Sequence, residues 1–348
     1  MTRVLRLGTR RSTLATTQSQ WVAERLRALG HTVELVEIVT EGDVSSASLA
    51  TLGGTGVFAA AIRRALLDGE VDLAVHSLKD LPTAPEPGLV VAAVPGREDP
   101  RDALVARDGL TLGELPAGSI VGTGSPRRVA QLAALGLGLE FKDIRGNVDT
   151  RIGYARSGAV DAVVLARAGL SRLGRLDDIT ETLDPLQMLP APGQGALAVE
   201  CRVDDPEVVA LLAAIDDADA RACVTAERAV LAALEAGCSA PVGALAEVVE
   251  GEQGLELSLR AFVGSVDGAI DLRRSVVGPV SEAARLGADL AAVLLEDGAD
   301  VLTTPEERPP ARRSAGWTPD PAEASRDSPP LAAPTETRPE PTATERAT

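Results

Sequence analysis

The chain has 348 residues, of which 45% are hydrophobic and only 2% aromatic, so its core has to be built from aliphatic side chains. A formal net charge of −17 disfavours non-specific binding to nucleic acid and to anionic membranes. No stretch approaches about 18 consecutive apolar residues, and the polar start MTRVLRLGTRRS does not look like a secretory signal. We therefore expect a cytoplasmic protein without a membrane span.

The three cysteines are too few and too scattered for a disulfide scaffold. With only two histidines and no CxxC pair, no metal site is expected. Cys201 ends an apolar strand and Cys223 lies on the apolar face of a helix, so both are expected to be buried. Cys238 follows a helix in the Gly/Ala/Pro loop AGCSAPVG, where an accessible thiol would lie. The residues alone leave open whether that thiol is functional.

The first part of the chain alternates between strand and helix patterns. Strands are expected at 4–7, 33–40, 71–77 and 89–95. Helices are expected at 14–29 and 57–69, and a glycine stands at the end of each pattern, as helix C-termini favour. This alternation indicates an α/β layer with a mostly parallel sheet.

A second alternation follows the segment REDPRDA (97–103). Strands are expected at 119–124, 139–145 and 159–166. Ser125 and Pro126 are expected to cap and open a helix, and Asn147 to cap the next one. The strand at 195–201 is expected to return to the first sheet.

The segment from 218 to 295 has a different pattern from the two alternations before it. A helix at 218–236, three strands between 242 and 278, and a helix at about 280–295 predict a smaller α+β domain. The segment 303–348 holds ten of the 23 prolines and is expected to be a disordered tail.

Three segments rich in arginine stand where strands end or helices begin: LGTRRS (7–12), GSPRR (124–128) and IRGNVDTR (144–151). Open α/β sheets bind ligands beyond the carboxyl ends of their strands, and helix N-termini favour anions. A guanidinium also matches a carboxylate with two parallel hydrogen bonds. The pattern therefore predicts a cationic cleft for a ligand with several carboxylates. The alternative is that these arginines are solvated surface charges.

HSLKD (76–80) ends a strand at the same expected edge and places Ser77, Lys79 and Asp80 near that cleft. A carboxylate beside cations stays ionised, so Asp80 would stabilise a developing positive charge or carry a proton. A simple turn with an ion pair is the alternative. His76 is interpreted as a buried supporting residue. The Gly-rich PGQG (192–195) lacks a phosphate-loop pattern and predicts tight hinges between domains, with Gln194 available for hydrogen bonds.

These segments together resemble the hydroxymethylbilane synthase (porphobilinogen deaminase) family from about residue 3 to 302. The matching stretches occur in the family's order: LGTRRS, VHSLKDLPT, REDPRDA, GSPRR, IRGNVDTR, AGLSRLG, PAPGQGALAVECR, RACVTAER and GCSAPVG. The resemblance implies two α/β domains like those of periplasmic binding proteins and a smaller C-terminal α+β domain. The expected division is 1–96 with 194–216, then 97–193, then 217–302, and the tail 303–348.

The family activity implied is a transferase reaction of tetrapyrrole biosynthesis. Four porphobilinogen molecules are joined head to tail with release of ammonia, giving linear hydroxymethylbilane. The resemblance also implies a dipyrromethane cofactor bound by a thioether to Cys238. Asp80 is the implied catalytic carboxylate, which would stabilise the cationic azafulvene, and a monomer is expected.

The resemblance further implies a set of residues that bind the cofactor and substrate. They are Arg10, Ser12, Ser77, Lys79, Thr123, Ser125, Arg127, Arg128, Arg145, Arg151, Arg172 and Gln194. Phe58 is expected to cover the cofactor as part of a lid. The lid departs from the family pattern, because Thr55 stands where a lysine is frequent and Ala59 to Ala61 replace a second lysine.

Two other functions compete with this one. A binding protein without catalytic activity would hold a carboxylate ligand between two α/β lobes. An enzyme that forms a Schiff base on Lys79 would bind an aldehyde cofactor. Neither alternative accounts for the arginine segments together with Cys238.

Overall fold

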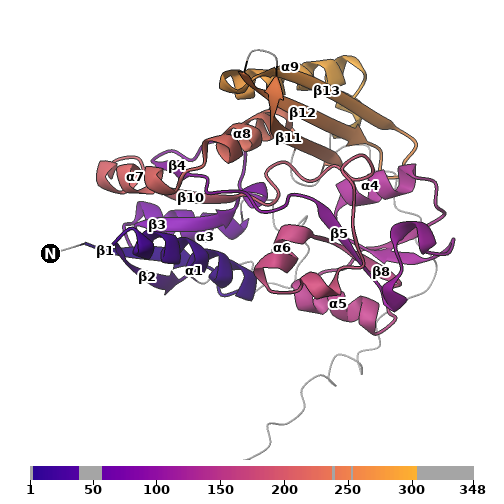
Figure 1. The fold of residues 1–348 in the computed structure, drawn as a ribbon, viewed down its shortest axis with the longest axis horizontal. Coiled ribbons are helices and arrows are strands. Elements are labelled where there is room, and N and C mark those ends of the chain that lie inside the picture. The colour runs from indigo at the N-terminus through magenta and orange to yellow at the C-terminus, as the bar shows by residue number, and fades with distance from the viewer. Residues whose placement is uncertain (1–2, 39–56, 237–239, 252–253, 304–348) are drawn as a thin grey trace, which may run out of the picture. The chain divides into compact units, whose positions relative to one another are not determined.

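The computed structural model describes residues 3–38, 57–236, 240–251 and 254–303. Three β-sheets organise this part of the chain, two of five strands and one of three (Figure 1). No helix in the described part is both long and apolar enough to cross a membrane. The expected fold class, two α/β layers followed by a smaller α+β unit, is confirmed.

The first sheet has the strand order β2-β1-β3-β10-β4. Its first three strands are parallel, and β10 lies antiparallel between β3 and β4, so the strand expected at 195–201 does return here. A core of Leu, Val and Ala side chains packs beneath α1. The strands are β1 (Val4–Thr9), β2 (Thr32–Glu37), β3 (Leu73–Ser77), β4 (Leu89–Ala93) and β10 (Leu197–Arg202), and the helices packed with them are α1 (Thr13–Ala28), α3 (Val57–Leu67) and α7 (Pro206–Leu212).

The second sheet repeats this arrangement in the order β7-β6-β8-β5-β9. Again three strands are parallel, and the fourth, β5, is antiparallel to both of its neighbours. The strands are β5 (Asp102–Ala106), β6 (Ile120–Gly122), β7 (Glu140–Lys142), β8 (Ala162–Ala166) and β9 (Glu181–Thr182), and the helices of this region are α4 (Pro126–Ala134), α5 (Val148–Arg156) and α6 (Arg167–Arg172).

The third sheet is an antiparallel meander whose buried face packs on α8 and α9 (Figure 1). Its core is aliphatic throughout, as the low aromatic content requires. The elements are α8 (Ala218–Ala233), β11 (Val242–Gly251), β12 (Gly254–Gly264), β13 (Asp271–Pro279), α9 (Ala283–Glu296) and α10 (Asp300–Thr303).

The sequence patterns missed five short strands and α-helices and one detail of capping. Strands β5 and β9 and helices α6, α7 and α10 were not predicted, because each has seven residues or fewer and little periodicity. Asn147 caps α5 as expected, its Oδ1 accepting from Thr150 N at 2.8 Å. Ser125 does occupy the N-cap position of α4, but its side chain accepts no helix N–H. Instead, Thr123 Oγ1 accepts from Ser125 N at 3.3 Å.

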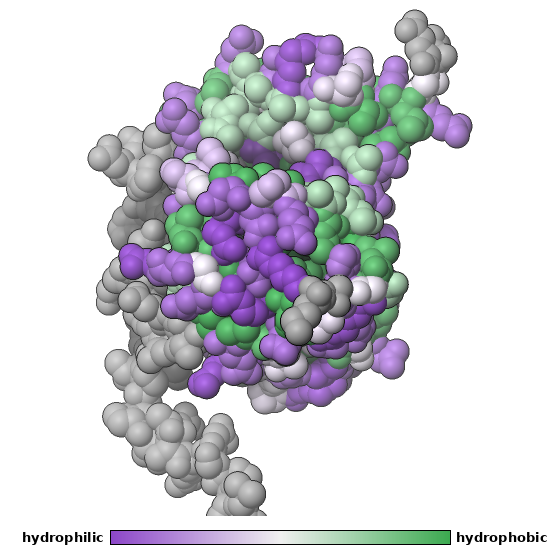
Figure 2. Space-filling model, turned by 90° about the vertical axis from the view of Figure 1, so that its left-hand side faces the viewer, coloured by the Kyte–Doolittle hydropathy of each residue, from purple (hydrophilic) through white to green (hydrophobic). Residues whose placement is uncertain are grey.

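The end of the molecule where the chain begins is held by ion pairs. Asp72, whose side chain is 4% exposed, accepts from Arg3 at 2.9 Å and from Arg6 at 3.0 Å, and Arg3 also pairs with Asp205. Burial alone would raise the pKa of Asp72, but the hydrogen bonds from Arg6 and Arg3 outweigh burial and lower it to about 2. Figure 2 shows that the middle of this face is mostly hydrophilic.

Candidate active site

The turn that follows β3 carries the two charged residues of HSLKD. It is a single 3-10 turn, η1 (Leu78–Asp80), in which Asp80 is exposed and Lys79 is half-buried. Lys79 Nζ donates to Gln194 Oε1 at 3.4 Å. Burial lowers the pKa of Lys79, and the Asp80 carboxylate opposes that shift. The turn therefore presents an accessible carboxylate beside an ammonium group.

Gln194 links this turn to the second sheet. Its side chain is 1% exposed, and its Nε2 donates to Pro100 O at 2.7 Å and to Asp102 Oδ1 at 3.0 Å. Gln194 lies between two glycines with positive φ, Gly193 (+78°) and Gly195 (+87°). These two glycines allow the sharp bends that let Gln194 contact residues of both sheets.

Asp102 lies at the start of β5 and holds two adjacent arginines. Its Oδ2 is 2.8 Å from Arg127 Nη1, and its Oδ1 is 2.7 Å from Arg128 Nη2. All three side chains are buried. Burial alone would raise the pKa of Asp102, yet the two guanidinium groups keep that carboxyl pKa well below its usual range. Two cations against one anion leave a surplus positive charge at this place.

The two guanidinium groups also donate to backbone carbonyls. Arg127 Nη1 donates to Leu189 O at 2.5 Å, and Arg128 Nη1 donates to Val164 O at 2.8 Å. Arg127 and Arg128 are thus fixed in place rather than solvated, which contradicts the alternative of free surface charges for this pair.

A second group of arginines comes from the start of α5. Arg151 Nε donates to Gly146 O at 2.9 Å, and Arg145 pairs with Asp143 at 3.3 Å. The pKa of Arg151 is lowered by burial and by the charges of Arg128 and Arg145, whereas Asp143 and then Asp80 oppose the shift. The charge of Asp80 therefore acts on Arg151, although Asp80 belongs to the first sheet and Arg151 to the second.

Arg172, at the end of α6, faces the segment that links the second sheet to β10. Its Nη2 donates to Gly195 O at 2.6 Å. Burial lowers the pKa of Arg172 to about 10, and Glu98 opposes the shift. Arg10 follows β1 and is half-buried.

The predicted hydroxyl groups have local partners. Ser12 Oγ caps α1 by accepting from Ala15 N at 3.3 Å. The Ser77 hydroxyl and the Gln18 side-chain amide exchange hydrogen bonds of 3.1 and 3.3 Å. These contacts fix the N-terminal turn of α1 and the end of β3.

The remaining buried residues agree with the sequence analysis. His76 is buried, with Nε2 3.4 Å from Glu200 Oε2, as expected for a supporting residue. Cys201 and Cys223 are buried, and burial raises the pKa of each thiol to about 11. Cys238, the Phe58 side chain, Thr55 and the tail from 304 lie outside the described residues. Among the described residues, no group of three or more His, Cys, Asp or Glu side chains is placed to hold a metal ion.

The comparisons with known proteins match nearly all of the described chain. The family described as "Porphobilinogen deaminase, dipyromethane cofactor binding domain" matches residues 5–210, and "Porphobilinogen deaminase, C-terminal domain" matches residues 221–296. The chain belongs to the porphobilinogen deaminase family. The expected family, and with it a transferase of tetrapyrrole biosynthesis, is confirmed.

Curated members of the porphobilinogen deaminase family are similar over their whole length. A porphobilinogen deaminase of Mycobacterium tuberculosis is 63% identical over 304 residues, which is 86% of this chain and 98% of that protein. One of Mycobacterium marinum is 60% identical over 312 residues, covering 88% and 99%. Among solved structures, the methionine-binding protein MetQ aligns with a TM-score of 0.39 at 14% identity, covering 61% of this chain and 89% of that one. A score this low adds nothing to the fold class, which rests on the sheets.

The sequence analysis missed one buried carboxylate, Glu227, which was not among the predicted site residues. Glu227 on α8 is fully buried and accepts from Arg97 Nη1 at 2.7 Å and Nη2 at 2.9 Å. It also accepts from Gly193 N at 2.7 Å and from Ala246 N at 2.9 Å. Arg97 and Gly193 stand in the two segments that connect the five-stranded sheets, so Glu227 ties both to β11. The sequence did contain a signal for Glu227: it is a charged residue on the face of α8 whose other buried residues are apolar.

Proposed function

We propose that this chain binds its oligopyrrole between the two five-stranded sheets and uses Asp80 as the catalytic carboxylate. The observation that carries the proposal is a chain of polar contacts between the turn of Asp80, on the first sheet, and the arginines of the second. Lys79 Nζ donates to Gln194 Oε1, and Gln194 Nε2 donates to Asp102 Oδ1. Asp102 in turn pairs with Arg127 and Arg128. A carboxylate that is accessible on one side and guanidinium groups on the other suit a ligand that becomes cationic but carries many carboxylates.

The donor set fits a dipyrromethane cofactor, whose two pyrroles each carry an acetate and a propionate. Arg127 and Arg128 supply a positive charge in excess of Asp102, and Arg145, Arg151 and Arg172 add further guanidinium groups. When bound, the cofactor supplies the pyrrole to which the first substrate is joined. Arg10, Ser12, Ser77, Lys79, Thr123, Ser125 and Gln194 complete the proposed binding set.

Asp80 acts on the incoming porphobilinogen. The bond between the aminomethyl carbon and its protonated nitrogen breaks, both bonding electrons leave with the nitrogen as neutral ammonia, and the positive charge passes to the pyrrole. The exposed Asp80 carboxylate accepts a hydrogen bond from the pyrrole N–H and stabilises that charge. In this proposal Asp80 also takes up the proton released when the new carbon–carbon bond forms. Lys79 and the arginines bind the substrate carboxylates and so keep them away from Asp80. This matters because two carboxylates close together would repel each other.

Cys238 is the proposed point of attachment, through a thioether. The test is the intact mass of the purified protein, followed by peptide fragmentation. We expect an increment of two pyrrole units on the peptide that contains Cys238, and none in Cys238→Ser. Cys223→Ser is the matched control and should keep the increment. A chain that stays unmodified after incubation with porphobilinogen would overturn the proposal and favour a non-catalytic carboxylate-binding protein.

The proposal extends to the organisation of the chain. We propose domains at 1–96 with 194–216, at 97–193 and at 217–302, with Phe58 on a lid over the cofactor. A monomer in the cytoplasm is the state that fits a transferase acting on small, charged molecules. Sedimentation of the purified chain tests the monomer.

A further inference from the structure

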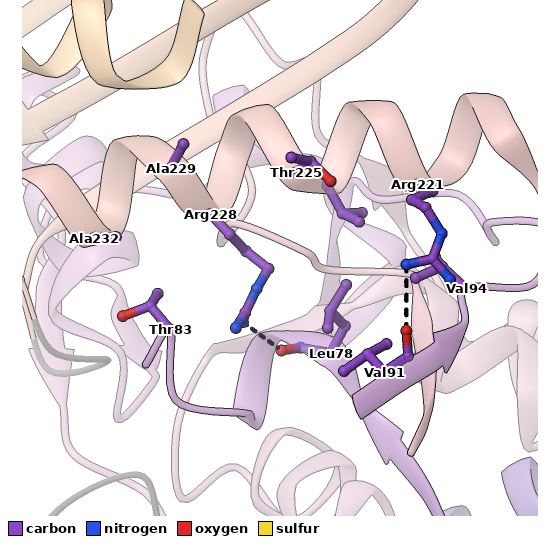
Figure 3. A pocket seen from close by; sticks show the side chains of 10 residues that line it. Leu78, Thr83, Val91, Val94, Arg221, Thr225, Arg228, Ala229 and Ala232 are labelled. Atoms are coloured by element: carbon purple, nitrogen blue, oxygen red, sulfur yellow. Dashed lines mark hydrogen bonds between the residues drawn. The ribbon is translucent and has the colours of Figure 1, made fainter. Parts of the chain in front are cut away.

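The turn that carries Asp80 is held from behind by an arginine of α8. Arg228 Nη1 donates to Leu81 O at 3.0 Å and to Leu78 O at 3.3 Å, and its Nη2 donates to Pro82 O at 2.6 Å. Figure 3 shows the guanidinium group reaching from the helix to the turn. One side chain therefore binds three carbonyl groups within the five residues 78–82.

A second arginine on the same helix makes a similar contact at a different place. Arg221 precedes Arg228 by seven residues, about two helical turns, and lines the same cavity of about 280 Å³ (Figure 3). It donates to Val91 O at 3.3 Å and to Ala92 O at 3.0 Å, on β4. It also forms an ion pair with Asp216 at 2.7 Å. Arg221 thus joins α8 to a strand, whereas Arg228 joins α8 to the turn of Asp80.

A 3-10 turn has few hydrogen bonds of its own. In η1, Leu81 N donates to Leu78 O at 3.1 Å, and Leu78 N donates to Ala196 O at 3.0 Å. The carbonyls of residues 81 and 82 lie beyond the turn, where no regular ladder pairs them. A planar fork of N–H donors fixes several such carbonyls at once, which a single ammonium group cannot do. Arg228 therefore supplies hydrogen bonds to carbonyl groups that the turn does not pair by itself.

The helix that carries Arg228 also leads to the proposed cofactor cysteine. Helix α8 ends at Ala233, five residues after Arg228, and Glu235 follows with φ of +49°. A rigid helix therefore relates the turn of Asp80 to the start of the segment that contains Cys238.

We propose that Arg228 is a positioning residue for the deaminase reaction: it sets the place of the Asp80 carboxylate relative to α8. This inference rests on the proposed function, because it requires Asp80 to act on the substrate. Displacing a catalytic group by about 1 Å is enough to slow a reaction roughly a hundredfold. Substrate binding depends on the arginines of the other sheet, so KM is expected to change little.

The test compares Arg228→Met with Arg221→Met in the full chain carrying its cofactor. Both changes remove hydrogen bonds to carbonyls next to one cavity, and Arg221→Met also removes an ion pair. Intact mass measures cofactor loading, and thermal unfolding measures stability. Arg228→Met is expected to keep the mass increment and to lower kcat roughly 10- to 100-fold, with KM within about threefold. Arg221→Met is expected to keep kcat within about threefold, although its Tm falls as far or further.

Hydrogen exchange of the peptide spanning 76–83 gives a readout that does not depend on activity. Its amides are expected to exchange faster in Arg228→Met than in Arg221→Met or the unaltered chain. Arg228→Lys, which restores one or two of the three hydrogen bonds, should recover part of kcat and is the variant to measure if Arg228→Met does not fold.

Two results would overturn the inference. One is a kcat within about threefold of the unaltered chain in Arg228→Met. The other is an equal loss of kcat in Arg221→Met, which would mean a general loss of stability. If the unaltered chain lacks the mass increment, the proposed function fails instead, and the two failures are thereby distinguished.

Discussion

The two five-stranded sheets share a pattern of strand directions, with one antiparallel strand in fourth place. At the proposed site, however, they carry side chains of opposite charge, and each is held by a side chain of the other sign. The first sheet presents a carboxylate, Asp80, on a turn held by the guanidinium group of Arg228. The second presents Arg127 and Arg128, held by the carboxylate of Asp102. The carboxylate that we propose to be catalytic is exposed, whereas the two arginines that we propose to bind the ligand are buried. Because Asp80 is exposed and Asp102 is buried, mutating Asp80 should mainly change the rate, whereas mutating Asp102 should mainly change stability.

The largest effect is expected where the second sheet loses its supporting carboxylate. Asp102→Asn leaves two buried guanidinium groups without an anion, and breaking a buried pair costs about 3–5 kcal/mol. Denaturant unfolding measures the loss. Arg145→Gln is the control, because the pair of Arg145 with Asp143 is half exposed or more and should contribute at most about 1 kcal/mol. Equal stabilities for the two variants would show that Asp102 does not support the arginine pair.

Removing Asp80, the proposed catalytic carboxylate of the first sheet, should lower the rate and leave stability unchanged. Asp80→Asn is expected to lower kcat roughly 30- to 1,000-fold, the equivalent of about 2–4 kcal/mol of transition-state stabilisation. Its Tm should stay within about 1–2 °C, because Asp80 is exposed. Single-turnover kinetics with porphobilinogen measure the rate. An activity close to that of the unaltered chain removes Asp80 from the mechanism.

A third prediction concerns Gly195, in the segment that connects the second sheet to β10 of the first. Gly195 has φ of +87°, and a methyl group there would overlap the carbonyl oxygen of Glu98. Gly174 has φ of +66° and open space around it, so Gly174→Ala should lower the free energy of unfolding only by the backbone strain, about 1–2 kcal/mol. Gly195→Ala should lower it further, because the steric overlap adds to that strain. Denaturant unfolding of both variants checks this, and a Gly174→Ala loss as large as that of Gly195→Ala would contradict it.

The smallest effect concerns the ion pairs at the far end of the first sheet. The pKa of Asp72 is about 2 in the folded chain, and about 3.9 in an unfolded one. A lowered carboxyl pKa stabilises the fold above about pH 4, and that contribution disappears as the pH falls towards 2. The stability difference between the unaltered chain and Asp72→Asn, on the order of 1 kcal/mol at neutral pH, should shrink over this window. Stabilities measured between pH 6 and 2 that differ by a constant amount would contradict the assignment.

The sequence predicted most regular elements, the fold class and the family, but few of the contacts that hold the proposed site residues in place. Strands such as 71–77 and the Asn147 cap follow from local patterns. Strand β5 escaped because the charges of REDPRDA conceal its short apolar run. The role of Asp102 depends on arginines 25 and 26 residues further along the chain, and that of Arg228 on carbonyls about 150 residues earlier. Such pairings arise only from the tertiary arrangement, which no local period encodes.

The place of β10 also decides when the first sheet can form during synthesis. This strand lies between β3 and β4, yet it begins at Leu197, whereas β4 ends at Ala93. A ribosome adding about 5–20 residues per second needs roughly 5–20 s to make the intervening segment of about 100 residues. During that interval β3 and β4 leave the exit tunnel with unpaired backbone edges, the kind of surface on which nascent chains aggregate. The first sheet, although made first, is therefore completed late, and chaperones have their longest period of access to it.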